Sequence, residues 1–221
     1  MKIGVFDSGK GGTTVLETIK RFLPEEEYYY IADSKNCPYG NKTKSELLEI
    51  TSGIVDELKK WGAEIVVVAC NTATTNCIKD LRDKYPELKF VGVEPAIKLA
   101  ADTGSRKILV MATPGTIKSE RTMALLNENR KSGQEIRLLA CPGLAETIEN
   151  DGDVGLALRN VLKEILAEAE EYDSVVLGCT HYPLIRDKIQ EFFPKAVLID
   201  GNVAVAKQVK RAIDEIKKSP L

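Results

Sequence analysis

The sequence is poor in the residues that build common metal and redox sites. Its 221 residues include one histidine, His181, and five cysteines, at positions 37, 70, 77, 141 and 179, with no Cys-x-x-Cys pair among them. A structural zinc site is usually tetrahedral and closed by cysteines and histidines. With one histidine, such a site would need three or more cysteines from distant segments, so we expect no metal in this protein.

The chain also lacks an excess of either charge and any long apolar run. Lys and Arg total 31 against 33 Asp and Glu, a net charge of −2. No run of like charges forms a tail, so we expect no nucleic-acid partner and no membrane partner. No segment is apolar enough to span a bilayer, and the stretch after Met1 is too short for the apolar region of a signal peptide. We therefore expect a cytoplasmic protein whose five cysteines are free thiols.

No cofactor motif is complete. Residues 9–14, Gly-Lys-Gly-Gly-Thr-Thr, place Thr14 where G-x-G-x-x-G needs a glycine, and Asp7 would repel a pyrophosphate. The pattern G-x-x-x-x-G-K-[ST] is missing, and no motif marks a Schiff-base lysine. Nucleotide binding stays an alternative, and we expect no cofactor.

Two copies of one pattern organise the chain. Residues 65–74, Ile-Val-Val-Val-Ala-Cys-Asn-Thr-Ala-Thr, run an apolar strand into Cys70 and small polar residues. Residues 174–183, Ser-Val-Val-Leu-Gly-Cys-Thr-His-Tyr-Pro, repeat this design around Cys179. In both copies a helical pattern follows. Each thiol should therefore lie at the carboxyl end of a buried strand, the edge where open α/β sheets place their ligands.

Strands and helices alternate along the whole chain, and residues 107–115 echo residues 2–9. We expect strands at residues 2–6, 28–32, 65–69, 90–93, 107–112, 136–140, 174–177 and 196–199. This alternation requires parallel sheets with helices on both faces. We predict an α/β fold of two pseudo-symmetric, doubly wound parallel-sheet halves with the active site between them. The predicted domains are residues 1–97 plus 201–221, with Asp7 and Cys70, and residues 98–200, with Cys179 and His181.

Local signals predict where the helices begin. Residues 43–46, Thr-Lys-Ser-Glu, have the capping-box pattern. Glu94 and Pro95 should open a helix that runs through Leu99, with the proline near its first turn. We also expect one helix over residues 154–169, and a last helix over residues 203–216 that packs back on the first half.

The paired thiols favour inversion at a carbon atom. A buried cysteine is usually a small hydrophobe, so we treat Cys77 and Cys141, which have no matching partner, as structural, and leave the role of Cys37 open. Cys70 and Cys179 occupy equivalent positions in the two halves. One thiolate can remove a proton from one face while the opposite thiol protonates the other face. Free cysteine has a pKa of about 8.5, so both forms are accessible near neutral pH.

Polar side chains surround both thiols in the sequence. Asp7 can orient Cys70 or accept its proton, and His181 can do the same for Cys179, although helix capping and a turn role are the plain alternatives. Other polar groups at strand-to-helix turns can hold anionic oxygens together with helix N-terminal N–H groups. They are Ser8, Asn71, Thr72, Thr113, Thr116 and Thr180. Helix capping alone would also explain any single one of them.

Five ordered motifs resemble one family, the cofactor-independent aspartate/glutamate racemases, and the bacterial glutamate racemases in particular. The resemblance spans nearly the whole chain. The motifs are Gly-Val-Phe-Asp-Ser-Gly at 4–9 with Gly11 and Gly12, Pro-Tyr-Gly at 38–40, Val-Ala-Cys-Asn-Thr-Ala at 68–73, Gly-Val-Glu-Pro-Ala at 92–96 and Gly-Cys-Thr-His-Tyr-Pro-Leu at 178–184.

The resemblance implies a reaction and a set of site residues. Cys70 and Cys179 would be the catalytic bases, assisted by Asp7, His181 and Glu149. Substrate glutamate would be held by Ser8, Pro38, Tyr39, Gly40, Asn71, Thr72, Thr113, Thr116 and Thr180. The family interconverts L- and D-glutamate without metal or pyridoxal phosphate and supplies D-glutamate for peptidoglycan. Whether the protein forms a homodimer is left undecided.

Some residues depart from the family pattern. Cys37 stands where an aliphatic residue is usual before Pro-Tyr-Gly, and Asp200-Gly201 replaces the usual Asp-Ser-Gly. Cys-Thr-His at 179–181, rather than the Cys-Thr-Glu common in aspartate racemases, favours glutamate. Two alternatives stay open: a racemase of aspartate or another small acidic amino acid, and a non-catalytic regulatory binding protein on the same scaffold.

Overall fold

The computed structural model describes residues 1–168 and 171–218, and these form two four-stranded parallel sheets. The first sheet has the strand order β2-β1-β3-β4 and the second has the order β6-β5-β7-β8. The strands are β1 (Lys2–Asp7), β2 (Glu27–Ala32), β3 (Ile65–Val68), β4 (Lys89–Gly92), β5 (Lys107–Ala112), β6 (Glu135–Ala140), β7 (Ser174–Leu177) and β8 (Val197–Ile199). The matching order of the two sheets confirms the predicted α/β fold of two pseudo-symmetric halves.

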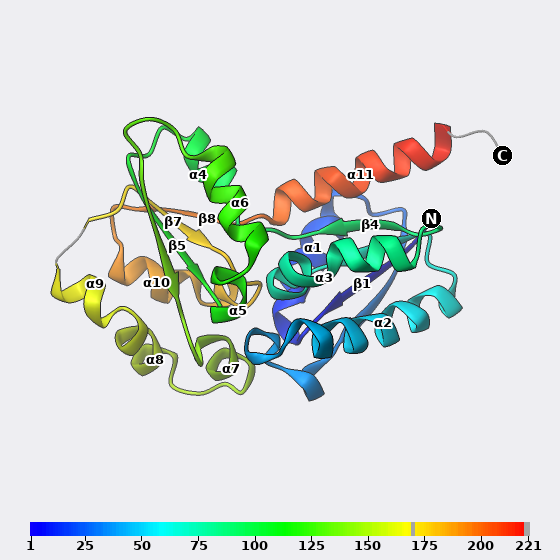
Figure 1. The fold of residues 1–221 in the computed structure, drawn as a ribbon, viewed down its shortest axis with the longest axis horizontal. Helices are drawn as coiled ribbons and strands as arrows, with labels where there is room; N and C mark the ends of the chain where they lie inside the picture. Colours follow the sequence, from blue (N-terminus) through cyan, green and yellow to red (C-terminus); the bar gives the residue numbers. More distant parts are fainter. Residues whose placement is uncertain (169–170, 219–221) are drawn as a thin grey trace.

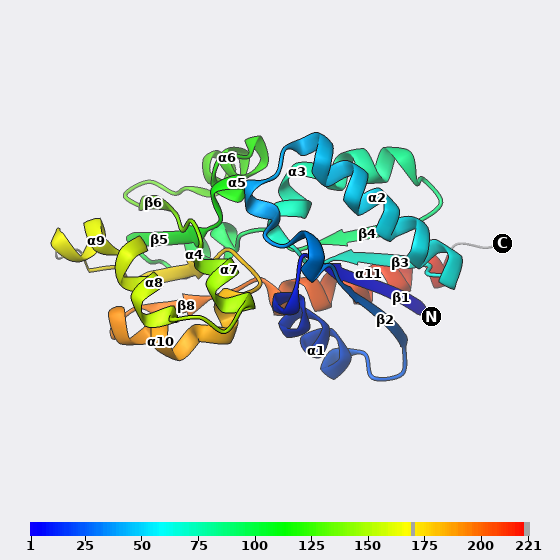
Figure 2. The same cartoon turned by 90° about the horizontal axis from the view of Figure 1, so that it is seen from below.

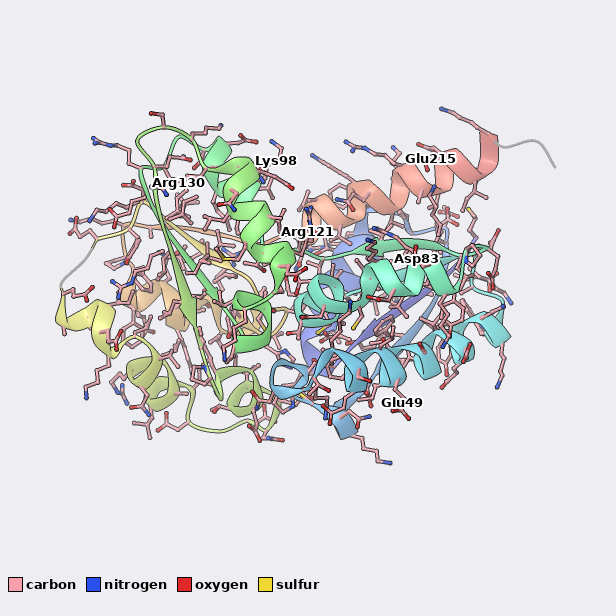
Figure 3. All side chains as sticks on the ribbon, viewed as in Figure 1. Glu49, Asp83, Lys98, Arg121, Arg130 and Glu215 are labelled. Carbon is pink, nitrogen blue, oxygen red and sulfur yellow. The ribbon has the colours of Figure 1, made fainter. Side chains whose placement is uncertain are left out.

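Helices cover both faces of each sheet, and the two halves lie side by side (Figures 1 and 2). The helices are α1 (Thr13–Phe22), α2 (Lys44–Trp61), α3 (Asn71–Lys84), α4 (Ile97–Asp102), α5 (Pro114–Ile117), α6 (Glu120–Asn129), α7 (Leu144–Glu149), α8 (Val154–Val161), α9 (Lys163–Ala167), α10 (Arg186–Phe192) and α11 (Asn202–Lys218). Among the described residues, we find no helix with the length and apolarity needed to cross a membrane.

Strand periodicity explains the layers of the first sheet. Ile65 and Val67 point to one face, where they pack with α1 and α11, while Val66 and Val68 point to the other, where they pack with α2 and α3. All four side chains have no exposed surface. Burying one such side chain contributes about 1.5–3 kcal/mol. β3 is therefore apolar throughout because both of its faces are covered.

The second sheet repeats this arrangement. Met111 and Leu177 pack with α7, α8, α9 and α10 on one face, and Val110 and Val176 pack with α4 and α6 on the other. The register of both sheets brings the strand ends together: Phe6 lies opposite Val68, and Met111 lies opposite Leu177. Cys70 and Cys179 each follow their strand by two residues, at the same edge of equivalent strands.

The last helix returns to the first half, as predicted. α11 contacts α1, β3 and β4, and the orange-to-red helix lies over the first sheet in Figure 1. Two connections join the halves, residues 93–96 between β4 and α4 and residues 200–201 between β8 and α11. The domain division at residues 1–97 plus 201–221 and 98–200 stays a proposal, and residues 219–221 lie outside the described residues.

The capping-box prediction is confirmed. Thr43 is the N-cap of α2, and its side chain accepts the N–H of Glu46 while the Glu46 carboxylate accepts the N–H of Thr43. α2 ends at Gly62, whose φ of 92° suits a residue without a Cβ.

Two predicted helices differ in the structure. The helix predicted to open at Glu94 and Pro95 begins only at Ile97, because residues 93–96 form the connection between the halves and turn at Ala96, where the N–H of Ile97 donates to the Pro95 carbonyl at 2.7 Å. The helix predicted over residues 154–169 is divided into α8 and α9 at Leu162, which is fully buried in the core of the second half. Residue 169 lies outside the described residues.

Two helices had not been predicted, and one begins later than predicted. α6 and α7 lie in segments where no helix was expected, and the helix predicted after Cys179 begins only at Arg186, after a 3-10 turn at residues 182–185. A capping signal was present for α6, since Ser119 accepts the N–H of Thr122 at 3.2 Å. α7 ends at Glu149, one of the predicted site residues.

Candidate active site

The two predicted thiols line one small cavity between the halves. Its volume is about 10 Å³, room for about one water molecule. The cavity is lined by Ser8, Pro38, Tyr39, Gly40, Cys70, Asn71, Thr72, Thr113, Ala145, Cys179, Thr180 and His181. Of the predicted site residues, Asp7, Thr116 and Glu149 lie behind this lining.

Cys70 lies at the N-terminus of α3, where it is the N-cap residue and is 5% exposed. Its Sγ lies 3.8 Å from Ser8 Oγ. Burial raises the pKa of the Cys70 thiol, and the nearby Asp7 carboxylate raises it further, whereas the N–H groups of Ala73 and Ser8 act in the opposite direction. The closed cavity therefore favours the neutral thiol.

Cys179 occupies the equivalent position in the second half. Its Sγ lies 3.8 Å from Nδ1 of His181. Burial again raises the pKa of this thiol, and the backbone N–H of His181 opposes that shift. Each thiol thus has a backbone N–H at the start of the following turn that can stabilise a thiolate, an arrangement that follows from the repeated strand-to-helix design.

Asp7 joins the two halves at the end of β1. Its carboxylate is fully buried, accepts the N–H of Gly12 at 2.7 Å and faces the hydroxyl of Thr180 at 3.3 Å. Burial raises the pKa of Asp7, while His181 and the N–H of Gly12 lower it. Neither the turn at Lys10–Gly12 nor α1 has a side-chain N-cap, so the bond to Gly12 is not the helix capping considered as an alternative. The bond from Thr180 is a contact that only the folded pair of halves provides.

Three threonine hydroxyls form a buried triangle across the halves. Thr72 Oγ1 lies 2.9 Å from Thr113 Oγ1 and 3.1 Å from Thr116 Oγ1, and the last two are 3.0 Å apart. Thr113 is also the N-cap of α5. Next to this triangle, Oδ1 of Asn71 is buried with no hydrogen-bond partner in the structure. A buried acceptor of this kind is costly unless a donor meets it, so Asn71 can receive an N–H group of a ligand.

The Pro-Tyr-Gly segment closes the cavity from the first half. Tyr39 is 1% exposed, and its hydroxyl donates to Asp33 at 2.7 Å. Gly40 lies against Thr113 of the second half, where an added Cβ would come within 2.8 Å of the threonine Cβ. In this closed form, Tyr39 contributes its ring to the wall rather than a free hydroxyl.

Glu149 lies directly behind His181. Its Oε2 is 2.7 Å from Nε2 of His181 and accepts the N–H of Lys10 at 2.9 Å, and its Oε1 accepts the hydroxyl of Ser34 at 2.7 Å. Burial would raise the pKa of Glu149, but the bonds from Ser34, His181 and Lys10 outweigh it, so its pKa is lowered. Glu149 is therefore a carboxylate that can hold His181 in one tautomer.

Sequence reasoning had not identified several contacts of this site. Ala145 on α7 lines the cavity, and Lys10 and Ser34 hold Glu149. Asp33 accepts the Tyr39 hydroxyl and the amide of Asn36 within one loop of the first half. Glu149 meets Lys10 and Ser34 across the two halves, and no local pattern signals such contacts.

Comparisons with known proteins agree with this geometry. The sequence profile of the family Asp/Glu/hydantoin racemase matches residues 3–209. The glutamate racemase of Clostridium novyi is 42% identical over 217 residues, which cover 96% of this chain and 83% of that protein.

Solved structures that are similar to this chain also include glutamate racemases. A crystal structure of Escherichia coli glutamate racemase, in complex with L-glutamate and an activator, has a TM-score of 0.88 and 33% identity, and the match covers 96% of this chain and 82% of that one. A glutamate racemase isoform from Bacillus anthracis has a TM-score of 0.82 and 31% identity, with coverages of 97% and 82%. The resemblance found in the motifs is therefore confirmed, and the chain belongs to the Asp/Glu/hydantoin racemase family.

Proposed function

We propose that this protein is an isomerase that interconverts L- and D-glutamate by proton transfer between two cysteines, without a cofactor. The observation that carries the proposal is that Cys70 and Cys179, from equivalent positions in two halves, line one small cavity. Relatives at about 40% identity are glutamate racemases, and the E. coli relative binds L-glutamate. These similarities favour glutamate over other substrates.

In the proposed reaction, each thiol serves one face of the α-carbon. A thiolate on one side takes the α-proton, the bond electrons pass into the carboxylate as a planar carbanionic intermediate, and the opposite thiol gives its proton to the other face. The reverse reaction exchanges the two roles. Because the cavity is shared and the thiols come from opposite halves, neither needs to move around the substrate.

The polar lining suits both charged groups of an amino acid. The unpartnered Oδ1 of Asn71 can accept from an ammonium group. The N-terminal N–H groups of α3 and the hydroxyls of Thr72 and Thr180 can donate to carboxylate oxygens. A well-aimed donor that strengthens its bond as charge develops is worth about 3 kcal/mol. An incoming ammonium group also offsets the burial that raises the pKa of the two thiols.

Substrate entry requires the halves to separate. A cavity of about 10 Å³ accommodates about one water molecule, far less than glutamate needs. The two connections at residues 93–96 and 200–201 lie against each other, since a Cβ on Gly201 would come within 3.2 Å of the Glu94 carbonyl oxygen, and they can act as hinges. Closure after binding would then expel water, which strengthens each hydrogen bond to the intermediate.

The test compares purified protein with Cys70→Ala, Cys179→Ala and, as a control, Cys77→Ala, whose thiol is buried on α3 outside the cavity. We expect racemisation of glutamate without added cofactor and incorporation of solvent deuterium at the α-carbon from either enantiomer. Each of the first two substitutions should lower kcat by at least about 10²-fold, and the control should leave it unchanged. Near-normal turnover without Cys70 or Cys179 would exclude the two-base mechanism.

The same assay separates the alternatives. Faster turnover of aspartate than of glutamate would favour the sister activity. Absence of turnover on a panel of acidic amino acids would favour a non-catalytic binding protein on this scaffold.

A biological role follows from the proposed reaction. We propose that the product D-glutamate supplies peptidoglycan synthesis, and hence cell-wall formation and cell shape, in the reducing cytoplasm where free catalytic thiols persist. Rescue of a bacterial D-glutamate auxotroph by the gene, and not by its Cys70→Ala variant, would test this. A homodimer stays a prediction, to be checked by light scattering.

A further inference from the structure

Three side chains of different chemistry converge beside the active site. Cys37, Glu149 and His181 each offer one ligand atom, and these atoms all lie within 4.8 Å of one another. Cys37 comes from the loop after β2, Glu149 from the end of α7 and His181 from the turn after β7. Sequence reasoning had considered only sites made mostly of cysteine, whereas this cluster combines a thiol, a carboxylate and an imidazole.

We propose that this cluster is an inhibitory binding site for a thiophilic divalent cation such as Zn²⁺. Thiolate, imidazole and carboxylate are the three ligand types that Zn²⁺ uses in proteins, with a solvent molecule free to complete a tetrahedron. Thiolate also selects zinc or cadmium against Mg²⁺ and Ca²⁺, which prefer oxygen.

The distances require only a small rearrangement. Zinc lies about 2.3 Å from sulfur and about 2.0–2.2 Å from nitrogen or oxygen, so tetrahedral ligand atoms are separated by about 3.5 Å. The widest pair in this cluster, at up to 4.8 Å, must close by about 1 Å. Oε2 of Glu149 and Nε2 of His181, now 2.7 Å apart, must move slightly further from each other.

The local charge favours a cation at this point. The carboxylates of Glu149, Asp7 and Glu146 all act on the Cys37 thiol. The nearest cationic side chain in the hydrogen-bond network, Lys10, is itself paired with Asp151 at 2.6 Å. Cys37 is half-buried, whereas Cys70 and Cys179 are buried, so an ion from solvent reaches it first.

Metal binding exchanges protons for metal–ligand bonds. The Cys37 S–H bond breaks, its proton leaves to solvent, and a metal–sulfur bond forms. Nε2 of His181 releases the proton that it shares with Glu149, and the neutral ring then carries its proton on Nδ1, so that one metal bond to each residue replaces their hydrogen bond. No electron transfer takes place, and the ion dissociates when a chelator lowers its free concentration.

Bound metal would inhibit the enzyme for two reasons, and this part of the inference rests on the proposed function. His181 would lose the carboxylate that orients it next to Cys179. In addition, Cys37 belongs to the first half and the other two ligands to the second, so the ion would tie the halves together across a cavity that must open for substrate.

The experiment separates metal binding from activity. Purified full-length protein is titrated with Cd²⁺, whose thiolate complexes absorb in the ultraviolet, and independently assayed with Zn²⁺. We expect one thiolate-bound Cd²⁺ per chain, loss of racemisation with Zn²⁺, recovery with EDTA and no effect of Mg²⁺. Cys37→Ala should lose the absorption and become at least about tenfold less sensitive to Zn²⁺, since even an outer-sphere partner is worth that much in metal affinity.

Two further variants make the result decisive. Cys77→Ala, a matched loss of a thiol outside the cluster, should behave like the original protein. Glu149→Gln should weaken Cd²⁺ absorption even if its turnover is too low to assay, so metal binding is measured whether or not the proposed reaction is correct. Full Cd²⁺ absorption and undiminished Zn²⁺ inhibition in Cys37→Ala would overturn the inference, because the ion would then bind Cys70 or Cys179.

Discussion

Oε2 of Glu149 lies 2.7 Å from Nε2 of His181, while Nδ1 of the same ring faces Sγ of Cys179 at 3.8 Å. This arrangement resembles a base held by a carboxylate in many hydrolytic triads, with a thiol in place of the hydroxyl. The hydrogen bond between Glu149 and Nε2 determines whether Nδ1 faces Cys179 with or without a proton. Cys70 has no histidine beside it; its neighbours are Ser8 and Asp7. The two thiols are thus equivalent in position but supported differently.

Glu149→Gln should lower kcat/KM by about 10²-fold, because the neutral amide stabilises a charged imidazole poorly. The decrease must be equal for both enantiomers, since the equilibrium constant of racemisation is fixed at one. The difference between the thiols should instead appear in the α-deuterium isotope effect, which should rise more in the direction where Cys179 takes the proton. Glu146→Gln, on the exposed side of the same helix, is the control. Equal isotope effects in the two directions would contradict a role for Glu149 through Cys179.

Alkylation of Cys70 should increase steeply with pH. Burial and then Asp7 raise the pKa of this thiol above that of a free cysteine. Since the reactive thiolate is the minor form below that pKa, the rate with iodoacetamide should rise about tenfold per pH unit through pH 9, where glutathione is already levelling off. Mass spectrometry of the Cys70 peptide gives the rate. Asp7→Asn should move the profile to lower pH, and an unchanged profile would show that the Asp7 charge does not act on this thiol.

Gly11→Ala should disturb the junction between the halves. An added Cβ would lie 2.7 Å from the backbone N of His181 and 2.8 Å from the carbonyl carbon of Thr180. Backbone atoms cannot move aside as a flexible side chain can, so the halves must shift apart. A shift of about 1 Å at reacting groups costs about 10²-fold in rate, while the fold should persist in circular dichroism.

The matched control for that substitution is Gly53→Ala. Gly53 lies in the interior of α2 with nothing within 4 Å of an added Cβ. Activity should be unchanged, and the free energy of unfolding should rise by about 0.5–1 kcal/mol because alanine suits a helix better than glycine. If both substitutions reduced activity equally, the contact with His181 would not be the cause.

Thr43→Ala should destabilise the protein without affecting catalysis. It removes the side chain that caps α2 and accepts the N–H of Glu46. Losing such a cap costs about 1 kcal/mol, which for a protein of this size lowers Tm by about 2–4 °C. Thermal unfolding followed by circular dichroism measures the change. Unchanged Tm would show that solvent replaces the cap fully.

The sequence alone determined those strands and helix starts whose signals lie within a few neighbouring residues. β3, which is apolar throughout, and β7, which is apolar after Ser174, each lead into a small polar turn and required buried parallel strands. Their repetition placed Cys70 and Cys179 at equivalent edges. Thr43 and Glu46 marked a helix start because both partners of the capping box lie within one turn.

The contacts between the two halves were determined only by the tertiary structure. The connection between the halves at residues 93–96 overrode the helical signal of Pro95, and the unpredicted α7 brought Glu149 to His181. The meeting of Cys37 with these two residues has no counterpart in any local spacing. Periodicity reports which face of an element is buried, whereas contacts between loops depend on how two separately formed sheets pack against each other. The equivalent positions of the two thiols were therefore evident in the sequence, whereas the size of the cavity between them and the identity of the groups behind them depended on packing.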